Sequence, residues 1–510
     1  MLTRRHFLPA AGAFALTPAW VRGAAPGNPF SLGVASGAPR PDGGVLWTRL
    51  APDPLRGGGM PAGTAAVRWR LCADPELRRT VQEGVFTTSD EIGHSVHVVL
   101  RGLEPGREYF YQFHVGEDDS PAGRLRTADP DATRTTLAVV SCQHYETGHW
   151  AGYQDLAAWA PDCVLHLGDY IYEGGASPLG RRVREVRGLE VVTDIVRQHQ
   201  GEELRTLWDY RNRYAQYRMD PALQAAHAAS PWLVAFDDHE VDNNWAGGVP
   251  QDPWAQTPAE FALRRQAAFR AYWEHMPLEH PPTATGLDAQ LQLYGAYRLG
   301  PVQLHLLDTR QYRSDQVCAD DFPGARSCAA LEDADRTMTG AVQERWLDDA
   351  LRRSGARWNA LAQQTWFAPY RYDDDPDAPS LNMDQWDGYP VQRRRLAERL
   401  GQVRGGIVLS GDWHCAAAMR IHATPEDPRS ARVATEFATT GMSSLCPWGP
   451  AVAAARPLNP HVPYVDTEGR GYLRCIATNT EWTSLYRVAV DALDPASEVR
   501  TDRELRVADL

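Results

Sequence analysis

The chain has 510 residues, of which 43% are hydrophobic and 23% are charged, a composition typical of a soluble globular protein. Its length exceeds what one core usually supports, so we expect a large domain with an accessory module. The formal net charge of −13 argues against a nucleic-acid-binding surface, and the absence of lysine makes every fixed side-chain cation an arginine.

The N-terminal 25 residues have the features of an export signal. Arg4 and Arg5 form a twin-arginine pair, followed by an apolar stretch that ends at Val21 and by small residues at 23–25. The stretch is shorter than the roughly 20 apolar residues that a transmembrane helix needs. We therefore expect residues 1–25 to be a twin-arginine signal peptide. The export machinery would then be a partner, and the mature protein would be periplasmic or extracellular without a transmembrane segment.

Residues 28–128 predict short strands separated by turns. The segments 30–34, 44–48 and 66–71 are apolar or alternating runs bounded by Gly, Pro and Asp. Leu103, Pro105 and Tyr109 have the spacing of the tyrosine corner found in β-sandwiches. We predict a small fibronectin-III-like sandwich that carries no catalytic residues.

From residue 135 the pattern changes to that of an α/β domain. Short apolar runs typical of buried strands occur at 137–140, 164–167, 233–236, 304–307, 360–362 and 407–409. Helical patterns at 257–275 and 342–353 separate some of these runs. The alternation predicts a domain over 135–495 with a central sheet covered by helices.

Polar side chains follow several of these predicted strands. The residues at the strand ends include Cys142, Asp169, Tyr172, Asp237, Asp238, His239, Arg310, Asp412 and His414. Because ligands bind at the carboxyl ends of strands in open α/β sheets, we expect these side chains to converge. Buried carboxylates raise one another's pKa and resist ionisation, so the cluster needs bound cations. The sequence therefore predicts a polynuclear metal site.

Three motifs carry a resemblance to a known family. They are GDYIYE at 168–173, FDDHEVDNN at 236–244 and SGDWH at 410–414. In this order they resemble the motifs of PhoD-type alkaline phosphatases, a branch of the calcineurin-like metallophosphoesterases. The resemblance extends from about residue 30 to about residue 490. It implies a four-layer α/β/β/α metallophosphoesterase domain behind the N-terminal sandwich.

The departures from the wider superfamily agree with this branch. Cys142 stands where the usual first motif has Asp and His, Asp238 replaces an asparagine, and Asp412 replaces a histidine. The resemblance implies Fe³⁺ held by Cys142, Asp169, Tyr172 and Asp412, with two Ca²⁺ ions beside it. Ligand chemistry agrees, because thiolate and phenolate suit trivalent iron, whereas the oxygens of Asp238 and Asn243 suit calcium. The sequence does not divide Asp238, Asn243 and His414 among the ions.

The implied activity is hydrolysis of phosphate monoesters or diesters by a metal-activated water. His239 or His414 would stabilise the transition state or protonate the leaving oxygen, and Arg310 would bind phosphate as a guanidinium fork. Two alternatives stay open: a phospholipase-D-like phosphodiesterase on the same site, and a non-catalytic exported protein that binds metal or phosphate. A purple acid phosphatase fits less well, because it would need histidines in place of Cys142 and Asp412.

Two loops stay undetermined by the sequence. The shapes of the loops 176–205 and 311–340 would decide between monoester and diester substrates. Within the second loop, Cys318 and Cys328 are equally compatible with a disulfide and with two free thiols.

Overall fold

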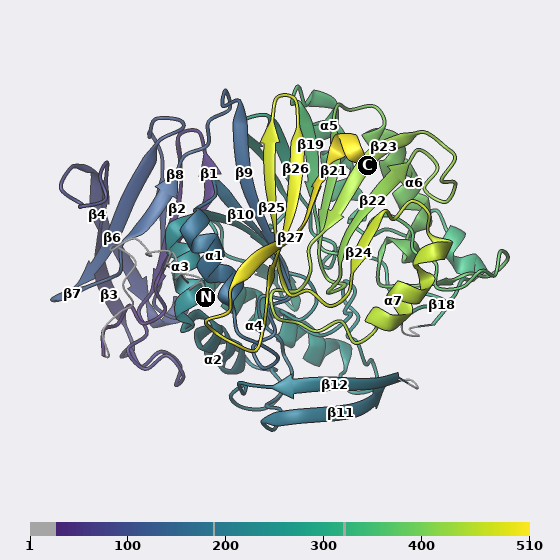
Figure 1. Cartoon of the computed structure of the whole chain (residues 1–510). Coiled ribbons are helices and arrows are strands. Elements are labelled where there is room, and N and C mark those ends of the chain that lie inside the picture. The colour runs from purple at the N-terminus through teal and green to yellow at the C-terminus, as the bar shows by residue number, and fades with distance from the viewer. Residues whose placement is uncertain (1–26, 187–188, 320–322) are drawn as a thin grey trace, which may run out of the picture.

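A computed structural model describes residues 27–186, 189–319 and 323–510. The predicted signal peptide, residues 1–25, lies outside this part of the chain. Two large sheets stand face to face in the centre of the molecule, and a smaller sheet lies beyond one end of them (Figure 1). No helix in the described ranges is long and apolar enough to cross a membrane.

The first sheet has nine strands. In spatial order they are β27 (Val499–Arg506), β26 (Trp482–Ala489), β25 (Gly471–Thr478), β9 (Arg134–Val140), β10 (Cys163–Leu167), β13 (Pro231–Ala235), β1 (Val34–Arg40), β2 (Gly43–Arg49) and β5 (Ser95–Leu100). Strands β9, β10 and β13 are parallel to one another, so their carboxyl ends lie at the same edge.

The second sheet has seven strands. Their order is β16 (Gly295–Leu299), β17 (Val302–Leu306), β19 (Trp358–Ala362), β21 (Gly406–Ser410), β23 (Arg432–Ala438), β22 (Ala416–His422) and β24 (Tyr464–Asp466). Strands β17, β19, β21 and β23 are parallel.

Apolar clusters define four layers. Leu137, Leu165, Leu304 and Leu409 belong to a core between the two sheets. A second core joins the outer face of the nine-stranded sheet to helices α1 (Ala151–Trp159), α2 (Leu207–Arg218), α3 (Pro221–Ala229) and α4 (Pro258–His275). A third joins the seven-stranded sheet to α5 (Gly340–Arg353), α6 (Pro390–Leu400) and α7 (Gly449–Ala455). The molecule is thus an α/β/β/α arrangement, which confirms the predicted fold class.

The N-terminal region forms a sandwich that shares a sheet with the rest of the chain. Strands β1, β2 and β5 pack against a five-stranded sheet made of β4 (Thr80–Ser89), β3 (Thr64–Cys72), β6 (Glu108–Val115), β7 (Asp118–Asp119) and β8 (Gly123–Arg126). Strand β1 also pairs in parallel with β13, through Ser36 with Pro231 and Gly37 with Trp232. The accessory module is therefore continuous with the large sheet through backbone hydrogen bonds.

The helices begin where local signals place them. Thr257 and Glu260 form a reciprocal capping box at the start of α4, and Pro258 occupies the first turn, where a missing N–H costs nothing. In α5, Gln343, Leu347 and Leu351 are the buried residues, spaced by one helical turn. Both helices lie where the apolar periodicity predicts them.

Three two-stranded antiparallel sheets lie outside the layers in the described part of the chain. They are β11 (Gly180–Val186) with β12 (Leu189–Ile195), β14 (Thr283–Thr285) with β15 (Asp288–Gln290), and β18 (Ala325–Arg326) with β20 (Ser380–Leu381). The first extends below the body of the molecule (Figure 1). Next to β18, Cys318 and Cys328 form a disulfide, with their Cα atoms 5.5 Å apart. The structure thereby resolves the alternative that the sequence left open for this pair.

Candidate metal centre

The turns after the central strands share an uncommon backbone conformation. Cys142 follows β9, Asp169 follows β10, and Asp412 and His414 follow β21; their φ angles are 54°, 56°, 61° and 53°. A non-glycine residue in this left-handed region costs roughly 1–2 kcal/mol. Such residues cluster at functional sites, where the surrounding structure holds the strained conformation. The shared conformation thus indicates that the candidate functional site lies at the sheet edge where these strands end.

Two glycines let the turns approach each other closely. A Cβ on Gly168, whose φ is 103°, would lie 2.3 Å from the Cβ of Asp237 and 2.4 Å from its backbone nitrogen. A Cβ on Gly411 would lie 2.5 Å from the Oγ of Ser141. Only glycine fits at these contacts. Gly168 therefore lets the turn of Asp169 approach the turn of Asp237, which follows a different strand of the same sheet. Gly411 lets the turn of Asp412 approach Ser141, which follows a strand of the other sheet.

Glu240 ties two of these turns together from behind. Its carboxylate accepts hydrogen bonds from the backbone N–H of Asp169 at 3.1 Å, of Tyr170 at 2.5 Å and of Asp237 at 2.9 Å. Burial, with a further contribution from the Asp169 carboxylate, raises the pKa of Glu240 to about 8. Glu240 therefore positions the Asp169 and Asp237 side chains and does not enter the cavity.

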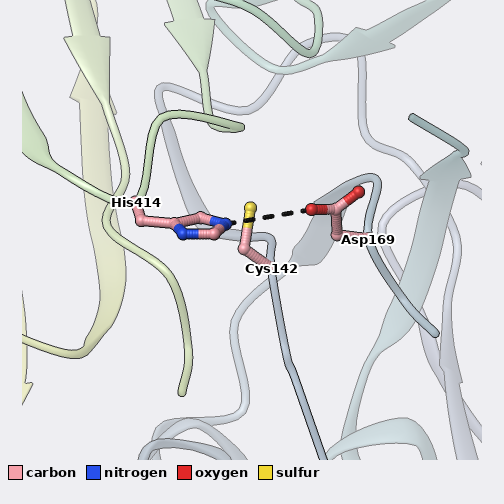
Figure 2. Close-up of side chains that lie close together, drawn as sticks. All are labelled: Cys142, Asp169 and His414. Atoms are coloured by element: carbon pink, nitrogen blue, oxygen red, sulfur yellow. Dashed lines mark ion pairs between the residues drawn. The ribbon is translucent and has the colours of Figure 1, made fainter. Parts of the chain in front are cut away.

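A thiol, a carboxylate and an imidazole converge from both halves of the chain. Figure 2 shows the Cys142 sulfur, the Asp169 carboxylate and the His414 ring facing one another, and their ligand atoms lie within 4.8 Å of one another. The Tyr172 hydroxyl lies 2.8 Å from Asp169 Oδ2 and 3.3 Å from His414 Nε2. These four residues, all predicted as metal ligands, meet at one point.

Carboxylates make up the adjoining part of the site. Asp169, Asp238 and His239 form one group with ligand atoms within 4.8 Å, and Asp237, Asp238 and Asp412 form another. Burial, opposed by Arg310 but aided by neighbouring carboxylates, raises the pKa of Asp238 to about 7 and raises the pKa of Asp237 well above its usual value. Asp169 and Asp238 therefore belong to more than one group, as bridging ligands would.

The two histidines are oriented by their Nδ1 atoms. His239 Nδ1 lies 2.6 Å from Glu173 Oε2, and His414 Nδ1 lies 2.5 Å from the Leu445 carbonyl oxygen. These partners make Nδ1 the protonated nitrogen in each ring and leave Nε2 for the cavity. Burial opposes charge on His239, but the Glu173 and Asp238 carboxylates outweigh it and raise the pKa of the ring well above its usual value. The Glu173 carboxylate thus both orients the His239 ring and favours its protonated form.

The cavity over these residues has a volume of about 230 Å³. Asn243, predicted as a calcium ligand, lines it beside Asp238 and Asp412. Asn382 and Asp384 also line it, and sequence reasoning missed both of them. They lie in the segment after β20 rather than after a large-sheet strand, so the strand-end pattern that identified the other residues does not apply to them.

Arg310 differs from its predicted role as a phosphate fork. Its side chain is fully buried and does not line the cavity. Two of its nitrogens bind the Asp384 carboxylate at 2.9 and 2.8 Å, and its Nε binds Asp237 Oδ1 at 2.5 Å. The guanidinium therefore neutralises the Asp237 and Asp384 carboxylates from the side opposite the cavity. Its nitrogens are directed at these carboxylates and not at a position that a phosphate could occupy.

The residues present fit metal ions of two kinds. Asp169 Oδ1, Asp237 Oδ2 and Asp238 Oδ1 are buried without a hydrogen-bond partner, and leaving such atoms unsatisfied costs free energy unless a cation binds them. Burial, and then the Asp169 carboxylate, raises the pKa of both Cys142 and Tyr172 well above their usual values. A thiolate and a phenolate can form here only with a strongly polarising ion, whereas the surrounding oxygens suit a hard divalent cation.

Comparison with known proteins agrees with this geometry. Residues 137–486 match the PhoD-like phosphatase family, and residues 16–129 match the PhoD-like phosphatase N-terminal domain. Alkaline phosphatase D of Bacillus subtilis (strain 168) is 41% identical over 484 residues, covering 93% of this chain and 80% of the relative. A solved structure of PhoD superposes with a TM-score of 0.86 at 39% identity, covering 94% of this chain and 90% of the other.

Substitution of Gly168 by alanine tests the close approach of the turns. The added methyl group would overlap Asp237, and alanine would be strained at the positive φ of this position. We therefore expect the Asp169 turn to shift and the purified protein to hold less than half of the wild-type metal. Elemental analysis measures this loss. Gly174→Ala is the matched control, because a Cβ there meets nothing within 4 Å. Equal metal content in Gly168→Ala and wild type would contradict the role given to Gly168.

Replacement of Arg310 by methionine tests its role as a buried counter-charge. Removing one partner of a buried ion pair costs about 3–5 kcal/mol of unfolding free energy, which denaturant titration would measure. Arg326→Met is the control, because the Arg326–Asp375 pair lies at the surface, where water screens it, and its loss should leave stability nearly unchanged. A variant of Arg310 with unchanged stability would instead favour a role in binding substrate.

Proposed function

The chain belongs to the PhoD-like phosphatase family and is a phosphoric ester hydrolase, and we propose that it is exported and acts at a centre of one Fe³⁺ and two Ca²⁺ ions. The observation that carries the metal assignment is the convergence of Cys142, Asp169, Tyr172 and His414 beside a group of buried carboxylates. The Cys142 thiol and the Tyr172 phenol lie on one side of Asp169, and carboxylate oxygens lie on the other. This arrangement supports two kinds of ion with Asp169 between them.

We assign Fe³⁺ to Cys142, Asp169, Tyr172 and Asp412, and Ca²⁺ to the oxygens of Asp238 and Asn243 together with the remaining oxygen donors. The grouping of Asp412 with Asp237 and Asp238 supports a position for Asp412 at the boundary between the ions. His414 Nε2 lies 3.3 Å from the Tyr172 hydroxyl and groups with Cys142 and Asp169, which supports a place for His414 near the iron.

The side chains of this site can bind and protonate a phosphate ester. When bound, the metal ions supply positive charge for the phosphate oxygens and activate the attacking water. His239, whose Nδ1 is paired with Glu173, can donate a proton from Nε2 to the leaving oxygen. Trp413 and Trp448 line the cavity and limit the access of bulk water to it.

The order of segments along the chain supports export as a folded protein. We propose that residues 1–25 are a cleaved twin-arginine signal, 28–128 an N-terminal domain and 135–495 the catalytic domain. Folding before export would allow the metals to be bound in the cytoplasm. Intact-mass measurement of the secreted protein tests the cleavage site.

The metal assignment predicts a coloured protein. A Tyr172 phenolate bound to Fe³⁺ gives a visible charge-transfer band, so we expect purple protein with about one iron per chain, and Tyr172→Phe should lose the colour. Tyr170→Phe is the control, because the Tyr170 hydroxyl contacts His227 away from the cavity. A calcium chelator should remove p-nitrophenyl phosphate turnover. Colourless wild-type protein containing only zinc would refute the iron assignment.

The proton donor is tested with substrates of different leaving groups. His239→Asn should reduce kcat by about 10²–10⁴-fold for an alkyl phosphate, because that leaving oxygen needs protonation. For p-nitrophenyl phosphate, whose leaving group departs as the anion, the reduction should be much smaller. An equal reduction with both substrates would assign His239 to metal binding. Parallel assays with a bis-ester decide between phosphomonoesterase and phosphodiesterase activity.

A further inference from the structure

A second pair of cysteines lies beside the metal centre. Cys415 follows His414 directly, and Cys446 follows Leu445, the residue whose carbonyl oxygen accepts the hydrogen bond from His414. The two sulfur atoms are 2.8 Å apart. Non-bonded heavy atoms rest at about 3.5–4.0 Å, and a disulfide bond measures about 2.05 Å. The sulfurs are therefore closer than two unlinked thiols would settle.

The segment that carries Cys446 supports the site at several points. Ser444 Oγ lies 2.7 Å from the Tyr172 hydroxyl, and the Trp448 ring packs at a tilt of 30° against His414 with centroids 5.1 Å apart. Trp448 also donates a hydrogen bond to the Trp413 carbonyl oxygen at 3.2 Å. This segment, residues 441–448, is irregular and connects β23 to α7. Backbone N–H groups of Met442 and Ser444 donate to the carbonyl oxygens of Ser141 and Cys142, so the first half of the segment is held by the backbone. Residues 445–448 contact the turn of Trp413 and His414 through hydrogen bonds that each involve a side chain.

We propose that Cys415 and Cys446 form a second disulfide in the exported protein and that this bond fixes segment 441–448 against His414. Cys415 is buried, whereas Cys446 is partly exposed, so Cys446 is the sulfur that an external oxidant reaches. The Cys446 thiolate attacks the disulfide of a thiol–disulfide oxidoreductase and releases one of its thiols. The Cys415 thiolate then attacks the Cys446 sulfur and releases the second thiol. Two protons and two electrons leave the pair, and the oxidant becomes a dithiol.

The bond would act on the metal centre through His414. Carbonyl groups that orient a ligating histidine typically contribute 10–100-fold to metal affinity. With the bond formed, the Leu445 carbonyl oxygen cannot move away from His414 Nδ1, so the imidazole keeps its orientation. This part of the inference rests on the proposed function, whereas the existence of the bond does not.

Peptide mapping tests the bond itself. The full-length protein, purified from the periplasm or medium, is alkylated under denaturing conditions without reductant and digested with trypsin. Peptides 405–420 and 433–470 should appear as one linked species that separates on reduction. The Cys318–Cys328 peptides are the positive control, and the free thiols Cys163 and Cys475 should be alkylated. Recovery of Cys415 and Cys446 as alkylated thiols would overturn the proposal.

Metal retention tests the effect on His414. After treatment with reductant, wild-type protein should lose metal to a chelator about 10-fold faster. Cys446→Ala should lose metal at that faster rate with or without reductant. A Cys318→Ala, Cys328→Ala double variant controls for the other disulfide and should respond as wild type does. A linked peptide with unchanged metal retention would refute the effect on His414. A linked protein without phosphatase activity would instead contradict the proposed function alone.

Discussion

The structure depends on the confinement of negative charge at one edge of two packed sheets. Asp169, Asp237, Asp238 and Asp412 lie together in a buried space, where each carboxylate opposes ionisation of the next. Arg310 balances part of this charge from the side opposite the cavity. The remaining charge and the unpaired carboxylate oxygens create the demand for metal ions. Arginine therefore has a structural role here, and the phosphate-facing positive charge is left to the metals.

Bringing the ligands together requires backbone that is unfavourable locally. The left-handed residues at the strand ends and the contacts at Gly168 and Gly411 would not persist in an isolated loop. Glu240 offsets part of this cost by accepting hydrogen bonds from two turns. The parallel strands support the turns, because β10, β13 and all of β9 except Arg134 are buried between the apolar cores on both faces. The ligands thus stand at the ends of strands that are packed on both sides.

The segments after β20 and β23 complete the site from outside the strand framework. The first supplies Asn382 and Asp384, and the second supplies Ser444 and the Leu445 carbonyl group. The two segments belong to the half of the chain that builds the seven-stranded sheet, whereas Cys142 and Asp169 belong to the nine-stranded sheet. The site therefore forms only when the two sheets pack, so metal binding and packing of the sheets stabilise each other.

The sequence by itself determined the α/β class, the N-terminal sandwich and those residues of the site that directly follow strands. Cys142, Asp169 and Asp412 each follow an apolar run that forms a buried strand. This pattern was sufficient to predict that they converge, because the carboxyl ends of parallel strands lie at one edge of a sheet. Only the tertiary structure decided that Arg310 faces carboxylates rather than the cavity, since that depends on Asp384, 74 residues away along the chain. It likewise decided the Cys318–Cys328 disulfide and the proximity of Cys446 to Cys415. Contacts between irregular segments have no periodicity, so no local pattern predicts them.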